Sequence, residues 1–123
     1  MGNEVMEYQK LYQDIMGLDR NIRMVTICDI DGKIMFSDHR PGVGNLLTPD
    51  ESRNSLEMAV NAWKSRSHLA SKIGKGKYVL AEYEKVKRIT MPFGDSHLVY
   101  VTAEPPANHV NIISGIASLA RAL

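Results

Sequence analysis

Residues 48–51 read Thr48-Pro49-Asp50-Glu51, and this stretch predicts where a long helix begins. The Thr48 side chain can accept a hydrogen bond from the backbone amide of Glu51, while the Glu51 carboxylate can accept one from the amide of Thr48. Pro49 takes the first helical position, where a missing amide hydrogen does no harm. This reciprocal cap is the clearest local signal in the chain.

The sequence after this cap has the apolar period of a helix. Gly74 and Gly76 are expected to end that helix, because glycine readily takes the conformation that follows a last helical turn. The predicted core-facing positions are Leu56, Ala59, Val60, Trp63 and Ala70, with Ile73 near the end. Trp63 has two interpretations that the sequence leaves open, since it can fill the core or anchor a partner.

Upstream of the cap, residues 22–29 and 33–38 form two β-type runs around Asp31-Gly32. Asp-Gly readily takes the positive φ angles of a tight turn, so these runs predict a β-hairpin. Residues 39–45 are rich in glycine and proline and predict a loop. We attribute Asp31 to turn chemistry instead of cation binding, because the pattern of an EF-hand loop is missing.

Downstream, three further strand-like runs cover residues 78–83, 86–93 and 97–103, and their even spacing predicts an antiparallel meander. Pro92 cannot donate to a ladder of hydrogen bonds, so we expect it at a strand end or on an edge.

A helix is also predicted at each end of the chain. Residues 3–18 place apolar side chains three and four apart and should end near Gly17, and Asn108 can cap a final helix. The first apolar stripe comprises Val5, Tyr8, Leu11, Tyr12, Ile15 and Leu18. The last comprises Val110, Ile112, Ile113, Ile116, Leu119 and Leu123.

Together these elements predict one α+β domain over residues 1–123, with the order α-β-β-α-β-β-β-α. A five-stranded antiparallel sheet sandwiched by helices would bury all three apolar stripes, if the long helix covers one face and the terminal helices cover the other. A chain of 123 residues is long enough to hold such a core.

This order of elements, together with residues 26–34 (TICDIDGKI) and 69–76 (LASKIGKG), resembles the roadblock family of profilin-like proteins. The resemblance implies dimerisation through paired long helices and joined sheet edges, here residues 51–72 and 77–83. It also implies a role in regulating small GTPases or motor and signalling complexes. The implied interface residues are Met58, Ala62, Arg66, Leu69, Tyr78, Leu80 and Glu82.

The residues themselves support a second partner for the long helix. Met58, Ala62 and Leu69 lie off the stripe of Val60, and a helix that is apolar on two faces needs two partners. The sheet supplies one, and a second copy of the chain is the economical candidate for the other.

Residues 64–88 carry eight Lys and Arg against two Glu, although the whole chain has a net charge of only +1. Candidate contacts for an anion or an acidic partner are Lys75, Lys77, Lys87 and Arg88. Few aromatic residues interleave with this band, so we favour a solvated face over nucleic-acid binding.

No catalytic, cofactor or metal motif is present in the sequence. The four histidines have no ligand spacing, and the single cysteine, Cys28, lies in an apolar run, which predicts a buried thiol and a cytoplasmic setting. No export signal or membrane span is predicted. The alternative to a non-enzymatic adaptor is a small-molecule sensor domain of the PAS or GAF kind, which also uses a five-stranded sheet flanked by helices.

Overall fold

The computed structural model describes residues 7–122. In chain order the elements are α1 (Tyr8–Met16), β1 (Ile22–Asp29), β2 (Ile34–His39), α2 (Pro49–Ser67), α3 (Ala70–Ile73), β3 (Val79–Glu82), β4 (Lys87–Phe93), β5 (His97–Ala103) and α4 (His109–Arg121). Residues 3–6 of the predicted first helix, with Val5, lie outside the described residues, as does Leu123 of the predicted last stripe. Glu7 is extended, so the first helix begins at Tyr8.

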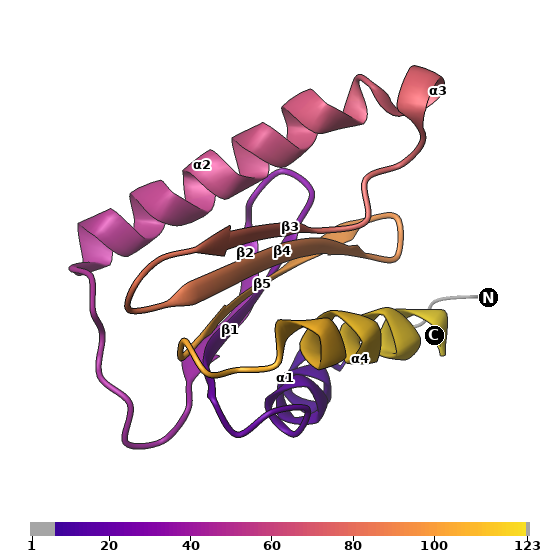
Figure 1. The fold of residues 1–123 in the computed structure, drawn as a ribbon. Coiled ribbons are helices and arrows are strands. Elements are labelled where there is room, and N and C mark those ends of the chain that lie inside the picture. The colour runs from indigo at the N-terminus through magenta and orange to yellow at the C-terminus, as the bar shows by residue number, and fades with distance from the viewer. Residues whose placement is uncertain (1–6, 123) are drawn as a thin grey trace.

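Among the described residues the strands form one five-stranded sheet in the order β2-β1-β5-β4-β3, and every neighbouring pair is antiparallel. Figure 1 shows α2 along one face of this sheet and α1 with α4 on the other. The predicted α+β sandwich is confirmed. Pro92 lies one residue before the end of β4, and β3 pairs with β4 only as far as Thr90.

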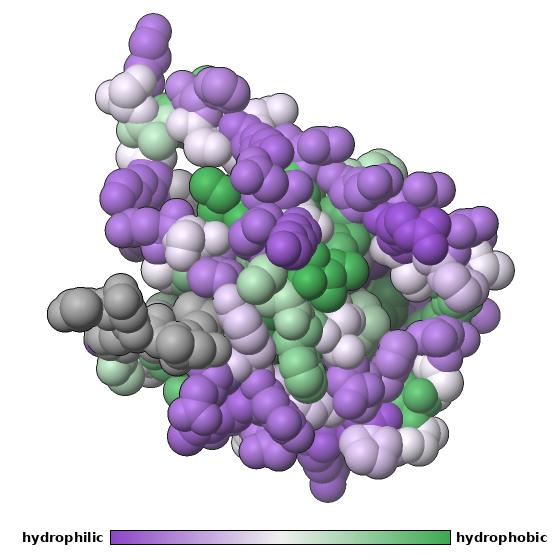
Figure 2. All heavy atoms as spheres, turned by 180° about the vertical axis from the view of Figure 1, so that it is seen from behind, coloured by the Kyte–Doolittle hydropathy of each residue, from purple (hydrophilic) through white to green (hydrophobic). Residues whose placement is uncertain are grey.

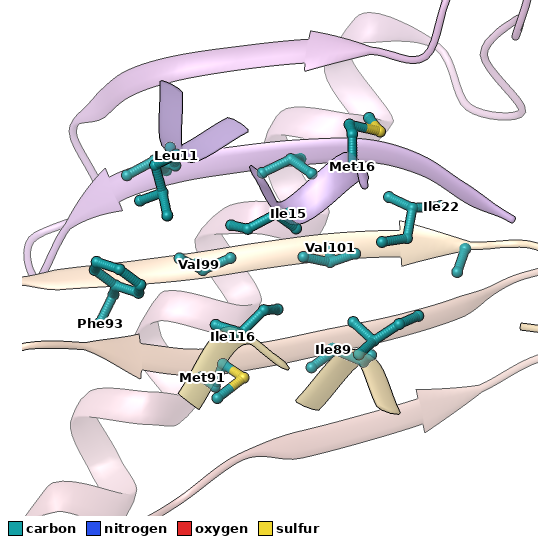
Figure 3. Packing of buried hydrophobic residues seen from close by; sticks show 14 of the residues in the cluster. Leu11, Ile15, Met16, Ile22, Ile89, Met91, Phe93, Val99, Val101 and Ile116 are labelled. Carbon is teal, nitrogen blue, oxygen red and sulfur yellow. The ribbon is translucent and has the colours of Figure 1, made fainter. Parts of the chain in front are cut away.

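The main core lies between the sheet and the two terminal helices. Figure 3 shows Ile15 and Ile116 reaching from α1 and α4 toward Val99, Val101 and other apolar residues of the sheet. A smaller cluster lies under α2 and joins Leu56 and Val60 of the helix to residues of β1 and β5, namely Cys28, Leu98 and Tyr100. Most of the apolar area that drives folding is therefore buried on the α1/α4 face.

The cap of α2 forms as predicted. The Thr48 amide donates to Glu51 Oε1 over 2.9 Å, and the Glu51 amide donates to Thr48 Oγ1 over 3.1 Å. The predicted end at Gly74 is wrong for α2, because this helix ends at Ser67. The Ser67 hydroxyl donates to the Trp63 carbonyl at 3.0 Å, and this hydrogen bond competes with those of the helix backbone.

The chain resumes as the short α3, which Gly74 ends at a φ of 93°. Because α3 is a separate helix, Ile73 does not continue the apolar face of α2. Its side chain is 78% exposed.

Asp31 and Gly32 lie in the β1–β2 turn, as predicted, and the side chain that organises this turn is that of Asp29. Asp29 Oδ1 accepts from the amides of Asp31 and Lys33, both at 2.9 Å, and Gly32 takes the positive φ of 93°. The hydrogen bond from the Lys33 amide is the main cause that lowers the pKa of Asp29. The Asp31 carboxylate instead lies 3.3 Å from Lys64 Nζ of α2.

The last helix begins as predicted, since the Asn108 side chain accepts from the Asn111 amide at 3.1 Å. Ile112 and Ile116 are buried, as their spacing predicts. Val110 does not belong to this stripe, because it lies in the first turn on the solvent side and is 65% exposed.

Asp19 ties the α1–β1 loop to the start of α4, and this connection should depend on pH. Its carboxylate accepts from the amides of Asn21 at 2.8 Å and Asn108 at 2.9 Å. Burial favours the neutral acid and is the largest single effect, yet these hydrogen bonds together hold the pKa of Asp19 below its usual value. The stability contributed by this carboxylate is therefore present above its unfolded-state pKa and is lost as the pH falls through the lower folded-state pKa.

We expect Asp19→Asn to lower the free energy of unfolding at pH 7 by roughly 1 kcal/mol, the difference between a charged and a neutral acceptor. Urea denaturation below about pH 4 should show a smaller loss of stability on acidification than in the unsubstituted chain. Asp95→Asn, in the exposed β4–β5 turn, controls for the loss of one negative charge. Equal acid sensitivity of the Asp19→Asn and unsubstituted chains would contradict this role.

Candidate interaction surface

The long helix α2 is only partly covered by the sheet. It has 19 residues, of which only Leu56 and Val60 are buried. Met58 is 72% exposed although it is apolar. A groove runs between this open side of α2 and the sheet, and its lining includes Met58, Ala62, Trp63 and Arg66 of the helix, Val79 and Ala81 of β3, and Arg88, Thr90 and Tyr100.

The groove adjoins a free edge of the sheet. β3 is the last strand in the sheet order and pairs only with β4. One side of β3 therefore has backbone donors and acceptors that can pair with another strand. Tyr78, just before this strand, is 50% exposed. The open side of α2 and the free edge of β3 form one continuous area, which we call the α2/β3 surface.

The structure brings together some of the predicted interface residues and separates others. Met58, Ala62 and Arg66 line the groove. Leu69 lies after the end of α2, in the turn toward α3, and is 51% exposed. Leu80 packs against the main core on the other face of the sheet, and Glu82 shares its side of β3.

Sequence reasoning missed Val79 and Ala81, which face the groove in place of Leu80 and Glu82. Successive residues of a strand point to opposite faces, so a choice between these two sets depends on which face meets the core. The run Val79-Leu80-Ala81 is apolar throughout and carries no alternation that could decide this.

The predicted basic band does not form as one surface. Lys75 and Lys77 are exposed in the segment between α3 and β3. Lys87 and Arg88 are neighbours in β4 and lie on opposite faces of the sheet. Lys87 is only 7% exposed, and its Nζ donates to the Ala107 carbonyl at 2.9 Å and lies 3.1 Å from His109 Nδ1. Lys87 is therefore a buried structural residue and cannot contact an external anion.

Arg88 lies half-buried on the α2 face of the sheet. Its guanidinium donates to Ser55 Oγ and stands 4.8 Å from the centre of the Tyr83 ring. Ser55 Oγ is also 2.9 Å from the Tyr100 hydroxyl. Within residues 7–122, the carboxylates lie beyond ion-pair distance of Arg88. A positive charge is thus held in place at the floor of the groove.

Trp63 combines the two interpretations given to it. It is partly buried against the smaller core cluster, and it also lines the groove. A Cβ at Gly76 would stand 3.3 Å from the indole ring, so the chain beyond α3 passes closely over Trp63. The side chain therefore forms a wall of the groove.

The β2 edge of the sheet is also open. Ile34 at the start of β2 is 52% exposed, and Ile30 in the preceding turn is 47% exposed. Figure 2 shows the molecule from the side opposite to that of Figure 1. Near the middle of this view apolar side chains gather, and polar side chains surround them.

His97 and Cys28 are the two side chains considered as a catalytic base and a nucleophile. His97 Nδ1 lies 2.9 Å from Ser96 Oγ, and its Nε2 lies 3.0 Å from the Tyr8 hydroxyl. Both ring nitrogens therefore face hydroxyl groups, and a tyrosine occupies the place where a carboxylate orients the base of a catalytic triad. Burial is the main cause that raises the pKa of the Cys28 thiol to about 11, which leaves it protonated and unreactive.

Among residues 7–122, no group of three or more histidine, cysteine, aspartate or glutamate side chains is placed to hold a metal ion. Over the same part of the chain, no helix has both the length and the apolar character needed to cross a membrane.

Comparisons with known proteins identify the fold. No family model and no curated protein matches the sequence. A roadblock/LC7 domain from Streptomyces avermitilis superposes with a TM-score of 0.72 at 13% identity, covering 97% of this chain and 94% of that one. A structure described as MglB with tetrameric arrangement has a TM-score of 0.76 at 12% identity, covering 94% and 83%. Profilin IA of Acanthamoeba castellanii has a TM-score of 0.61 at 9% identity, covering 93% of each chain.

The chain therefore has the roadblock form of the profilin-like fold, as its order of elements predicted. At identities of 9–13%, these likenesses concern the fold.

Proposed function

We propose that this chain is a non-enzymatic adaptor that self-associates through the α2/β3 surface and presents the resulting assembly to another protein. The observation that carries the proposal is the incomplete burial of α2 beside the free edge of β3. A second copy could pair its own β3 with this edge and cover Met58 and Ala62 with its own helix. A two-fold arrangement of this kind uses the same surface on both copies.

The fold comparison supports the proposal, since one similar protein is described in a tetrameric arrangement. The partner that we propose is a small GTPase or another component of a signalling or motor complex, as the resemblance to the roadblock family implies. The setting that we propose is the cytoplasm, because the only cysteine is buried as a free thiol.

Self-association is tested by light scattering over a dilution series, with an expected mass near twice 13.7 kDa. Met58→Glu combined with Leu69→Glu should weaken association at least about tenfold, because burying one unpaired charge costs more than the 1.4 kcal/mol that corresponds to this factor. Both side chains are exposed in the single chain, so its fold should persist.

Val110→Glu is the matched control, because it introduces the same charge at an exposed apolar position of α4. It should leave the mass unchanged. A strict monomer at every concentration would refute self-association. A dimer that the double substitution leaves intact would place its interface elsewhere.

Partner binding is tested separately by titrating the chain with purified small GTPases loaded with GDP or with a GTP analogue. The expected result is a complex with at least one of them whose affinity depends on the nucleotide. If none of these GTPases bound, the GTPase proposal would be contradicted, and the proposal of self-association would be unaffected.

A further inference from the structure

A second hollow lies on the α2 face, beneath the loop that leads into α2. Leu46 and Leu47 of this loop line it, together with Met24, Val86 and Tyr100. Leu46 is 55% exposed and Leu47 is 36% exposed. Two adjacent leucines that remain partly in water beside a hollow are a feature of binding surfaces.

Polar anchors hold this loop in place. Arg40, where the loop begins, donates to three backbone carbonyls at 2.7–3.0 Å, those of Ile22, Met16 and Asp19. In the middle of the loop the Gly44 carbonyl accepts from Arg23 Nη2 at 2.7 Å. The loop ends at the reciprocal cap of residues 48–51. The hollow is therefore preformed, as binding sites usually are.

The lining of the hollow is positively charged. Arg23 and Arg88 contribute to it, and its lining includes no aspartate or glutamate. The charge of Arg23 is already balanced by an ion pair with Glu104. Arg88 contacts Ser55 Oγ and the Tyr83 ring, and the carboxylates within residues 7–122 lie beyond its reach. A ligand with one negative charge would complement Arg88.

We propose that this hollow docks a short segment of a partner protein in which an aspartate or glutamate stands beside a bulky apolar side chain. The carboxylate pairs with Arg88, and the apolar side chain packs against Leu46 and Leu47. This proposal rests on the role of the chain as an adaptor, but it does not depend on self-association through the α2/β3 surface.

The test is selection from a library of random displayed peptides on the whole chain, followed by titration of the best synthetic peptide. The selected sequences should share an acidic residue next to a bulky apolar one. Changing that acid to its amide should weaken binding about tenfold, the effect of losing a hydrogen bond to a charged group. Leu46→Ser with Leu47→Ser should weaken it by a similar factor, because two apolar contacts are lost.

Two further variants separate this site from its neighbour. Arg88→Gln should remove the preference for the acid over the amide, whereas Arg66→Gln, which changes only the α2/β3 groove, should keep it. Met58→Glu with Leu69→Glu should bind the peptide normally even where it no longer self-associates.

Three results would overturn the proposal. The first is selected peptides that lack acidic residues, and the second is unchanged binding to the Leu46→Ser, Leu47→Ser chain. The third is displacement of the peptide by hexanoate at an equal concentration, which would show a site for small carboxylates. Each of these outcomes can occur with the dimer intact, so failure here is distinguishable from failure of self-association.

Discussion

Phe93→Ala should lower the free energy of unfolding by about 3–5 kcal/mol, the usual range for removing a buried aromatic side chain. Phe93 is 1% exposed and heads the fully buried side chains by volume. It lies at the end of β4 and belongs to the core beneath the sheet (Figure 3). Since domains are stable by only about 5–15 kcal/mol, this single change removes a large part of the total.

Urea denaturation measures this effect as a lower midpoint with an unchanged slope. Val110→Ala is the control, because this side chain is 65% exposed and its truncation should change stability by less than about 0.5 kcal/mol. A loss of less than about 1 kcal/mol for Phe93→Ala would contradict the packing described for this face.

Lys87→Glu should lower the free energy of unfolding by about 3–5 kcal/mol, the cost of a buried charge without a partner. The carboxylate would face the Ala107 carbonyl, which now accepts a hydrogen bond from Lys87 Nζ. Two acceptors would then confront each other where the site is almost closed to water.

Lys85→Glu is the matched control, because Lys85 lies two residues away in the exposed β3–β4 turn. It makes the same change of charge and should alter stability by less than about 0.5 kcal/mol. Thermal and urea denaturation of both variants measure this difference in the free energy of unfolding. Equal stability of the two would mean that Lys87 is a solvated surface residue.

The features that could be predicted from the sequence are those that depend on neighbours in the chain. The cap at Thr48 and Glu51 is one, because both hydrogen bonds join residues three apart. The alternation of buried and less buried residues in β4 is another. Lys87 lies on the same side of this strand as the buried Ile89, Met91 and Phe93. This pattern was a signal that could have revealed the burial of Lys87.

The features that could not be predicted depend on residues far apart in the sequence. Which side of β3 faces the groove is decided by the pairing of Leu80 with Ile89, whose side of the sheet carries the main core. The loop before α2 is held by Arg23, which lies 21 positions before Gly44. Such contacts form only once the sheet has assembled, so the pattern of neighbouring residues in the sequence does not predict them.

Arg88 lines both hollows of the α2 face. An occupant that takes up its remaining hydrogen-bond donors on one side leaves fewer for an occupant on the other. Two ligands that each pair with this guanidinium therefore weaken one another, and the thermodynamic linkage is reciprocal: each lowers the affinity for the other by the same factor. A single side chain thus connects the two hollows of this small domain, so that an acidic ligand in one disfavours an acidic ligand in the other.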